Sequence, residues 1–393
     1  QTLLRDRLMD KILSVYRAAG FSRITTPAIE SMENLEKSDG GDNLNLIFKI
    51  MKRGDKLKRA VEGGKFDEIA DCGLRYDLTL PLARYYANNK ELLPNPFKVI
   101  QIDRVYRAER PQKGRLCEFV QCDIDIIGSK SGTAETELIH TTAKALLEIG
   151  ISGFKIRVND RRILKNILAY AGFEKDRLDT VCVTFDKLDK IGIDGVKKEL
   201  DEKGFDAEVI AGFAQILESG EITLEKAKMY GDNKELAEKL GGIIDISNEL
   251  SDGKYSVYYD ASLVRGQGYY TGTVFEISCD EFGGSVGGGG RYDNMIGRFL
   301  GQDIPAVGFS IGFERIFSIL SERGDNGEER KKIAVLYDEG EIKEALMYRN
   351  GIKDYDVTLC IKSKKPGKQF ENLAKNGYYA AVFLNDTANW KIF

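Results

Sequence analysis

The sequence has 393 residues, of which 42% are hydrophobic and 31% are charged, and its formal net charge is −4. A chain of this length can form roughly two or three domains with a large core. The small net charge gives no argument from composition for a nucleic-acid partner, and no apolar run comes near the ~18 residues of a membrane span. Six scattered cysteines and one histidine argue against a Cys/His zinc site and are typical of free thiols in a reducing compartment.

The N-terminal region shows a helix pattern followed by a strand pattern. Apolar residues three and four positions apart over residues 3–16 predict an amphipathic helix that ends at Gly20. Residues 21–29 predict a strand. Because Pro27 cannot donate a ladder hydrogen bond, we expect an edge strand, a bulge or an interface strand here.

A strand end followed by a helix is predicted over residues 74–86. Pro81 fits the first turn of such a helix, where a backbone donor is not needed. Asp77 and Thr79 mark the junction between the two elements. Either side chain could simply cap the helix, which is the default interpretation of an isolated junction.

The central stretch of the chain predicts an antiparallel hairpin with a long basic loop. Strand patterns end at Tyr106 and resume over residues 119–127, and the intervening residues 109–115 are polar. Arg107 and Glu109 are two positions apart, so we expect them on one face of the first strand. Buried charges need partners, so such a face is either solvated or the floor of a site. The adjoining apolar runs and the basic loop favour a floor that binds an anionic ligand. The second strand places these residues on one face: Phe119, Gln121, Asp123 and Asp125.

The middle of the chain changes from mixed to helical patterns. Residues 133–150 predict a helix stopped by Gly150. This helix carries His140, which we interpret as a structural or surface residue. Residues 174–250 lose strand signals, and apolar residues recur there at helical spacing between glycines, which predicts a helical insertion.

Two glycine-rich segments follow, over residues 263–277 and 283–293. Glycine lets a backbone approach a ligand closely or turn with positive φ, although glycine-rich hairpin turns are common. Residues 306–316 then predict a strand that feeds a helix, with Arg315 just inside the helix. Arginines and tyrosines among the glycines favour a planar or anionic ligand: Arg265, Tyr269, Tyr270, Arg291 and Tyr292.

The C-terminal part predicts a separate small domain. A charged linker over residues 321–332 precedes alternating strand and helix patterns, which predict a βαβαβ domain. Residues 390–393 again have strand character, which leaves open whether the domain continues beyond them.

Three segments resemble the motifs of the class II aminoacyl-tRNA synthetases. The strand with Pro27 resembles motif 1, which builds the dimer interface in that class. Arg107-Ala108-Glu109 and the following hairpin resemble motif 2, and residues 308–315 resemble motif 3. Residues 263–272 and 289–293 are similar to the histidine-specific segments of the histidyl-tRNA synthetases. The chain resembles that family over essentially its whole length.

The resemblance implies an α+β architecture: a class II antiparallel sheet flanked by helices, with a helical insertion and a C-terminal α/β domain. It implies a catalytic domain in two parts, residues 1–173 and 251–322, interrupted by the insertion at 174–250. Residues 333–393 occupy the place of the anticodon-binding domain.

The resemblance also implies the reaction, which is ATP-dependent attachment of histidine to tRNA(His) through a histidyl-adenylate. We therefore expect a cytoplasmic homodimer that binds histidine, tRNA(His) and ATP with Mg²⁺, with no zinc, prosthetic group or membrane contact. The implied ATP-binding residues are Arg107, Glu109, Arg115, Phe119 and Arg315. The implied histidine-binding residues are Asp77, Thr79, Gln121, Asp125, Arg265, Tyr269 and Tyr270. Arg107 and Arg265 are the implied catalytic residues, placed beside the reacting phosphate.

The chain departs from the family pattern at a few positions. Leu116 and Cys117 stand where the family usually has an aromatic-basic pair, and Gly268 stands where it usually has Asp. Asp77 is the acidic residue of Leu74-Arg75-Tyr76-Asp77-Leu78-Thr79, which matches a shorter variant of the corresponding family segment. These departures concern individual contacts and leave the reaction class unchanged.

The alternative from another class is a binding protein, the histidine-binding regulatory paralogue that accompanies ATP phosphoribosyltransferase. That paralogue lacks the anticodon domain and generally loses the motif arginines, whereas this chain has Arg107, Arg265 and Arg315 and a C-terminal βαβαβ pattern. A plain nucleotide-binding module would leave Asp125 and the paired tyrosines unexplained. The sequence therefore favours the enzyme.

Overall fold

A computed structural model describes the protein over residues 1–36, 45–110, 115–218, 220, 222–264, 269–324 and 330–393. The chain divides into two compact units, Gln1–Gly324 and Asp325–Phe393. Among the described helices, none combines the length and the apolar character needed to cross a bilayer.

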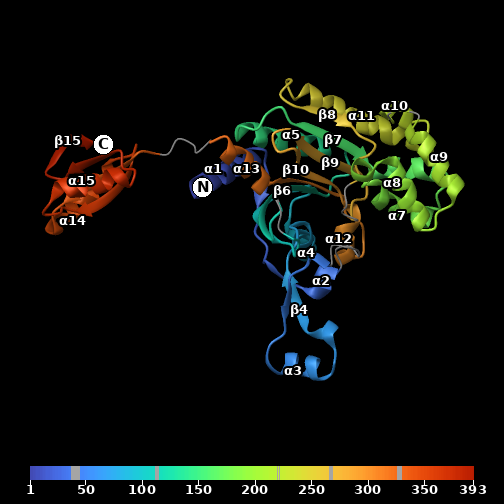
Figure 1. Cartoon of the computed structure of the whole chain (residues 1–393), viewed down its shortest axis with the longest axis horizontal. Coiled ribbons are helices and arrows are strands. Elements are labelled where there is room, and N and C mark those ends of the chain that lie inside the picture. The colour runs from blue at the N-terminus through green and yellow to red at the C-terminus, as the bar shows by residue number, and fades with distance from the viewer. Residues whose placement is uncertain (37–44, 111–114, 219, 221, 265–268, 325–329) are drawn as a thin grey trace. The chain divides into compact units, whose positions relative to one another are not determined.

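The first unit is built on an eight-stranded sheet with the order β1-β5-β6-β11-β10-β9-β7-β8 (Figure 1). The inner strands pair antiparallel, whereas β1 runs parallel to β5 and β8 runs parallel to β7. The predicted α+β class is confirmed, although the sheet is mixed at its two edges. The strands span Ser22–Arg23 (β1), Phe97–Tyr106 (β5), Glu118–Ile127 (β6), Lys155–Asp160 (β7), Ser256–Tyr259 (β8), Thr273–Cys279 (β9), Gly284–Arg291 (β10) and Ala306–Gly312 (β11).

The alternation of side chains along β6 separates two differently packed faces of the sheet. Ile124 and Ile126 enter a large apolar core with helices α1, α5 and α13. Ile127 enters a second core with α4 and α12. On this second face the β6 residues before Ile127 are mostly polar, so the apolar packing gives way to a polar wall. The helices span Thr2–Ala18 (α1), Thr79–Asn89 (α4), Thr133–Glu148 (α5), Asp293–Leu300 (α12) and Phe313–Glu322 (α13).

The continuous strand predicted over residues 21–29 is wrong. β1 ends at Arg23, and the next strand, β2, begins at Ile29 in a separate three-stranded sheet of order β2-β4-β3. Pro27 lies between them, where its missing N–H and fixed φ interrupt strand pairing. β1 nevertheless lies at an edge of the large sheet, as expected. The small sheet comprises Ile29–Ser31 (β2), Lys49–Met51 (β3) and Ala70–Leu74 (β4), and with α3 (Gly54–Glu62) it projects from the large sheet (Figure 1).

The helical pattern predicted over residues 174–250 is confirmed as a set of short helices. Aromatic rings pack edge to face between them: the ring centroids of Phe173 and Phe205 are 5.5 Å apart, and those of Phe185 and Phe213 are 5.4 Å apart. These helices belong to the same compact unit as the sheet, so the domain boundaries at 173 and 250 stay a prediction. The helices are Leu178–Phe185 (α7), Leu188–Glu202 (α8), Ala207–Glu218 (α9), Leu224–Ala227 (α10) and Asn233–Glu249 (α11), and Arg161–Tyr170 (α6) precedes them.

The second unit is a small α/β fold, as predicted. Its four-stranded sheet has the order β13-β12-β14-β15, with β15 antiparallel to β14 and the other pairs parallel. Ala334, Leu336, Leu373 and Ala381 form its buried core. The elements are Lys332–Tyr337 (β12), Ile342–Gly351 (α14), Asp356–Ile361 (β13), Pro366–Lys375 (α15), Ala380–Phe383 (β14) and Asp386–Ile392 (β15).

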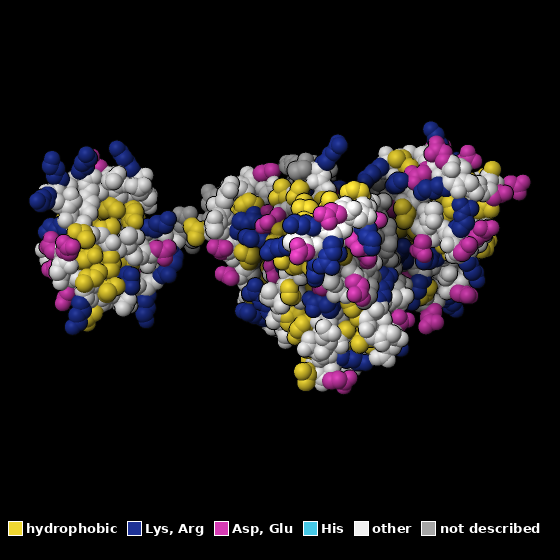
Figure 2. All heavy atoms as spheres, turned by 90° about the horizontal axis from the view of Figure 1, so that it is seen from below, with side chains coloured by type: hydrophobic (Ala, Val, Ile, Leu, Met, Phe, Trp, Pro, Cys, Tyr) yellow, Lys and Arg dark blue, Asp and Glu magenta, His cyan; other side chains and the backbone are white. Residues whose placement is uncertain are grey.

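The surface charge agrees with the small net charge of the sequence. On the face shown in Figure 2, basic and acidic side chains of the described residues are interspersed over both units. On this face the described residues therefore form no continuous basic surface of the kind that binds nucleic acid.

Candidate active site

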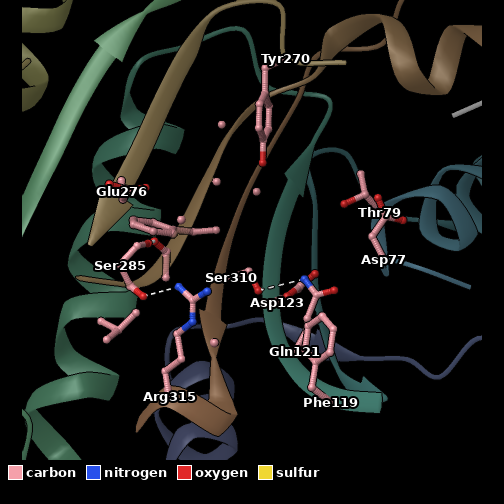
Figure 3. Close-up of a pocket in the computed structure, with 18 of the residues that line it drawn as sticks. Asp77, Thr79, Phe119, Gln121, Asp123, Tyr270, Glu276, Ser285, Ser310 and Arg315 are labelled. Atoms are coloured by element: carbon pink, nitrogen blue, oxygen red, sulfur yellow. Dashed lines mark hydrogen bonds between the residues drawn. The ribbon is translucent and has the colours of Figure 1, made fainter. Parts of the chain in front are cut away.

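The sheet carries a cavity of about 630 Å³ on the face where β6 is polar (Figure 3). The cavity brings together residues that are far apart in the chain, from Leu46 to Arg315. Arg265 and Gly268 lie outside the described residues, as does part of the basic loop, residues 111–114. The other residues expected to bind ATP or histidine all line this one cavity: Asp77, Thr79, Arg107, Glu109, Arg115, Phe119, Gln121, Asp125, Tyr269, Tyr270 and Arg315.

The polar face of β6 forms one wall of the cavity. Phe119, Gln121, Asp123 and Asp125 all line it, as their alternation predicted. β6 is hydrogen-bonded to β5 on one side and to β11 on the other, so this wall lies inside the sheet. Asp123 is 5% exposed and Asp125 is 3% exposed, so this end of the face is buried rather than solvated.

One expectation about the first strand of the hairpin is wrong. β5 ends at Tyr106, so Arg107 and Glu109 do not share a strand face. The Arg107 backbone N–H still donates to the Cys117 carbonyl at 2.8 Å, and the side chains of both Arg107 and Glu109 line the cavity. A turn away from the strand therefore brings them to the site.

Three arginine side chains line the cavity and contact neighbouring groups. The Arg107 Nε donates to the Tyr76 carbonyl at 3.0 Å, and its guanidinium carbon lies 5.0 Å from the centre of the Phe119 ring. The Arg315 guanidinium donates to the Ser285 carbonyl and lies 5.6 Å from the Phe282 ring centre. Arg115 is 3.2 Å from Glu109. Planar cations held in this way can bind phosphate oxygens through several parallel hydrogen bonds.

Asp77 occupies the junction between β4 and α4. Its Oδ1 accepts from the Leu80 backbone N–H at 3.1 Å, and its Oδ2 accepts from the Tyr269 hydroxyl at 3.5 Å. The side chain thus caps the first turn of the helix and also faces the cavity, and its role as a ligand contact stays a prediction. Burial raises the pKa of Asp77, although the hydrogen bond from Leu80 acts in the opposite direction.

Asp125 is held against Tyr292 at the buried end of the wall. The Tyr292 hydroxyl donates to Asp125 Oδ1 at 2.7 Å. Burial raises the pKa of Asp125 to about 7, although this hydrogen bond acts in the opposite direction. A Cβ on Gly308 would lie 1.9 Å from Asp125 Oδ1, so a side chain there would displace the carboxylate. Tyr292 was recognised from the sequence only as one of several aromatic residues among glycines.

The glycines of β10 serve the packing of the chain itself. A Cβ on Gly289 would lie 2.0 Å from the Gly308 carbonyl oxygen, and one on Gly290 would lie 2.8 Å from the Tyr270 ring. Arg291, which the sequence suggested as a ligand contact, is instead 4% exposed and donates to Glu135 at 2.8 Å. It does not line the cavity, whereas Tyr292 does.

Strand β7 contributes residues that sequence reasoning missed. The Arg157 guanidinium is 2.6 Å from Asp260, 3.1 Å from Glu276 and 3.0 Å from the Ser262 hydroxyl. The fully buried Asn159 donates to the carbonyls of Ala261 at 3.2 Å and Leu263 at 2.9 Å. The Arg161 backbone N–H donates to the Gly272 carbonyl at 3.1 Å. β7 and the residue after it therefore anchor both ends of the segment that carries Tyr269 and Tyr270. No local sequence pattern indicates these contacts, because they join residues more than 100 positions apart.

We expect Asn159→Ala to lower the free energy of unfolding by roughly 2 kcal/mol, because a buried carbonyl and a part-buried carbonyl lose their donor. Because Tyr269 and Tyr270 line the cavity, it should also raise the KM for a ligand bound there. Asn248→Ala is the matched control, because Asn248 pairs with both backbone groups of Val257 at 2.8 Å and does not line the cavity. Urea denaturation and steady-state kinetics should show a stability loss in both variants and a KM change in the first alone. Equal KM values in the two variants would contradict the anchoring role.

The helical part of the first unit also reaches the cavity rim. Asp186, at the end of α7, and Lys190, in α8, are exposed residues that line it. His140 lies on α5 and does not line the cavity, in agreement with its interpretation as a structural or surface residue. Among the described residues, no three His, Cys, Asp or Glu side chains lie close enough to hold a metal ion.

The β5–β6 hairpin and the β11–α13 junction present arginines to one cavity on a largely antiparallel sheet. This is the catalytic fold of the class II aminoacyl-tRNA synthetases. The sequence model of the family described as histidyl-tRNA synthetase matches residues 1–316. The chain belongs to the histidyl-tRNA synthetase family.

Two curated relatives show the extent of the similarity. The histidine–tRNA ligase of Leifsonia xyli subsp. xyli is 43% identical over 354 residues, which cover 85% of this chain and 80% of the relative. The histidine–tRNA ligase of Aeropyrum pernix is 39% identical over 339 residues, which cover 84% and 74% of the two chains.

Solved structures agree with the fold. The histidyl-tRNA synthetase from Nostoc sp. PCC 7120 has a TM-score of 0.75 at 26% identity and covers 97% of this chain and 88% of its own. A Bacillus halodurans C structure, titled as an ATP phosphoribosyltransferase regulatory subunit/histidyl-tRNA synthetase, has a TM-score of 0.76 at 21% identity and covers 97% and 93%. At 21% identity, the similarity to the Bacillus halodurans C structure supports the fold and carries no statement about function.

Proposed function

We propose that this protein is a histidine–tRNA ligase that attaches histidine to tRNA(His) through a histidyl-adenylate. The observation that carries this proposal is one cavity that combines fixed arginines with buried carboxylates, in a chain whose relatives are histidine–tRNA ligases. The arginines suit the phosphates of ATP, and the carboxylates suit the cationic and N–H groups of histidine.

In the first step an oxygen of the histidine carboxylate attacks the α-phosphorus of ATP. The bond from this phosphorus to the bridging oxygen breaks, and pyrophosphate leaves. The nucleophile is ionised at neutral pH and needs no general base, so catalysis comes from placement and charge neutralisation. ATP is expected to bind with Mg²⁺, and the reaction requires no zinc or prosthetic group. In the second step a hydroxyl of the 3′-terminal ribose of tRNA(His) attacks the carbonyl carbon of the histidyl-adenylate. The bond from this carbon to the phosphate oxygen breaks, and AMP leaves.

The proposed ATP contacts follow the arginine end of the cavity. Arg107 binds the α-phosphate, and Arg315 binds the outer phosphates or the adenine. Phe119 provides a flat face for the adenine, and Glu109 accepts from its amino group. Arg115 lies at the exposed side, where its side chain is 52% accessible, and it can reach the outer phosphates.

The proposed histidine contacts follow the buried end. Asp77, Thr79 and Gln121 hold the amino and carboxylate groups, and Asp125 accepts an imidazole N–H. Tyr269 and Tyr270 enclose the imidazole, and their ring centroids are 4.9 Å apart. The 3.5 Å contact of Tyr269 with Asp77 favours a second role for Tyr269 beside the amino group. Arg265, outside the described residues, is proposed on the family resemblance to stand beside the reacting phosphate.

The regulatory-paralogue alternative is not favoured, because the chain retains Arg107 and Arg315 in the cavity and has a C-terminal α/β unit. We propose that this unit, residues 333–393, binds the anticodon, and that residues 174–250 form an insertion between two parts of the catalytic domain. All six cysteines are unpaired in the structure, which supports a cytoplasmic location.

The test of the function is histidine-dependent exchange of pyrophosphate into ATP, followed by charging of tRNA(His). Exchange with histidine, and not with other amino acids, is expected. A folded protein that binds histidine without supporting exchange would favour the regulatory alternative.

We further propose a homodimer formed through the region around Pro27. Ile29, two residues after Pro27, is 57% exposed, and Phe48 and Met51 are 36% and 61% exposed in the same part of the fold. A stable interface of this kind should bury about 2,000 Å² or more.

Light scattering at micromolar concentration should therefore give twice the chain mass of 44.0 kDa. Ile29→Asp should shift the mass towards the monomer, whereas Val183→Asp, at a 51% exposed position of α7, should leave it unchanged. A monomeric parent protein would contradict the proposal.

A further inference from the structure

An acidic side chain lines the cavity next to an arginine that is proposed to bind ATP. Glu314 is the second residue of α13 and directly precedes Arg315, and both side chains line the cavity. The Glu314 side chain is only 14% exposed. An unpaired carboxylate at this place would repel the phosphates of ATP, and little water would screen it. The site therefore needs a group that neutralises this charge.

Helix α1 supplies such a group from outside the cavity. α1 and α13 lie side by side (Figure 1), and the Arg5 guanidinium donates to Glu314 Oε2 at 2.8 Å and to Glu314 Oε1 at 2.5 Å. Arg5 does not line the cavity. Its guanidinium carbon lies 5.1 Å from the ring centre of Phe313 and 4.8 Å from that of Phe317. A planar cation that forms two parallel hydrogen bonds holds a carboxylate in one orientation.

The backbone of β6 binds the same carboxylate from another direction. The ladder between β11 and β6 ends where Gly312 pairs with Gln121. The next backbone N–H, that of Val120, donates to Glu314 Oε1 at 3.4 Å. Val120 directly follows Phe119, which is proposed to face the adenine. Glu314 thus joins α1 to the part of β6 that carries Phe119, and its charge is directed towards Arg5.

We propose that Arg5 is a positioning residue of the ATP site, which binds and neutralises the Glu314 carboxylate so that its charge does not oppose the phosphates. The inference rests on the proposed function and extends it to a residue outside the cavity. The reason is electrostatic. A paired carboxylate contributes little net charge to the site, whereas an unpaired one adds a full negative charge beside a polyanion.

The test compares ATP with adenosine, each bound to the parent and to Arg5→Ala without histidine, so that no adenylate forms. Adenosine has the adenine and the ribose but no phosphate, so an unpaired charge on Glu314 should act on ATP alone. Calorimetry with Mg²⁺ present should show the Kd for ATP raised about tenfold, as expected for one partly screened charge near the phosphates. The Kd for adenosine should change by less than about threefold.

Removing the carboxylate as well should reverse the loss. The double variant Arg5→Ala/Glu314→Gln should bind ATP within about threefold of the parent, because neither charge remains. Glu314→Gln alone should bind ATP at least as tightly as the parent. Its amide oxygen can still accept from Val120, and the charge of Arg5 is then uncompensated.

Stability separates this role from a purely structural one. Arg5→Ala and the double variant both lose the packing of Arg5 against two rings, so both should melt below the parent, whereas only Arg5→Ala should lose ATP affinity. Arg323→Ala is the matched control. Arg323 donates to both oxygens of Glu281, its side chain is 34% exposed against 30% for Arg5, and it does not line the cavity. This variant should bind ATP as the parent does.

Equal weakening of ATP and adenosine by Arg5→Ala would overturn the proposal, as would unchanged ATP binding or a loss that persists in the double variant. Each of these results would assign Arg5 to the packing of α1 on α13. If Arg5→Ala does not fold, weaker ATP binding by folded Glu314→Gln overturns the proposal by itself. Absence of ATP–pyrophosphate exchange in the parent would instead contradict the proposed function, and the binding comparison would still decide the role of Arg5.

Discussion

Replacing Arg107 by alanine is expected to slow histidyl-adenylate formation by about 10²–10³-fold, the usual cost of removing one donor from a developing oxyanion. Negative charge grows on the α-phosphate oxygens as the histidine carboxylate attacks. Arg107 is preorganised for this charge, because the Tyr76 carbonyl fixes its Nε at 3.0 Å and the Phe119 ring lies under its guanidinium. Single-turnover formation of adenylate, measured with saturating histidine and ATP, checks the result.

Two further variants define what Arg107 contributes. Arg107→Lys should rescue the rate poorly, because an ammonium is a single point charge and cannot replace the planar fork. Arg104→Ala is the matched control, since Arg104 lies on the same hairpin with its side chain 65% exposed and paired with Glu118. It should react at the parent rate. If folded Arg107→Ala protein forms adenylate within a few-fold of the parent, Arg107 is structural.

Residual activity in Arg107→Ala is expected, because Arg265 is proposed to act on the same phosphate. Arg265 lies outside the described residues, and its assignment rests on the family resemblance of residues 263–272. If both arginines stabilise one transition state, replacing both by alanine should slow adenylate formation by less than the product of the two single fold-changes.

Local patterns were sufficient to predict the wall of the site. The period-two alternation from Phe119 to Asp125 predicted one polar face, because strand geometry sends alternate side chains to opposite sides. Arg315 was predicted just inside a helix, and it lies in the first turn of α13. In both cases the information lies within a few residues of the chain.

Contacts between distant segments could not be predicted from such patterns. The partner of Asp125 is Tyr292, 167 positions away, and Asp77 meets Tyr269 across 192 positions. Asn159 anchors Leu263 only because β7 happens to lie beside that segment in the fold. The prediction of one strand over residues 21–29 was wrong for a different reason. The backbone of Pro27 interrupts strand pairing, so two short strands form on either side of it.

The second large effect is expected at Asp125. Asp125→Asn should lower kcat/KM for histidine by about 10²–10³-fold, because breaking a buried, hydrogen-bonded polar pair costs roughly 3–4 kcal/mol. The Kd for ATP should stay near the parent value. Tyr292→Phe keeps the carboxylate and removes only the hydroxyl that holds it at 2.7 Å, so its effect should be smaller, about tenfold. Parent-like histidine kinetics in Asp125→Asn would show that another group recognises the imidazole.

The pH dependence of Asp125 gives an independent check. Burial raises its pKa to about 7, so the carboxylate that accepts an imidazole N–H forms as the pH rises through 7. The KM for histidine should therefore fall between pH 6 and pH 8, and in Asp125→Asn this dependence should shrink to that of free imidazole.

The free energy of unfolding should change in the opposite direction to histidine affinity, and fall as the pH rises. The protonated form is favoured in the folded protein, so its contribution is complete below the unfolded pKa of about 3.9 and is lost as the pH rises through about 7. The melting temperature of the ligand-free parent should fall from pH 5 to pH 8 more steeply than that of Asp125→Asn, and histidine should reduce the difference because it binds the ionised form.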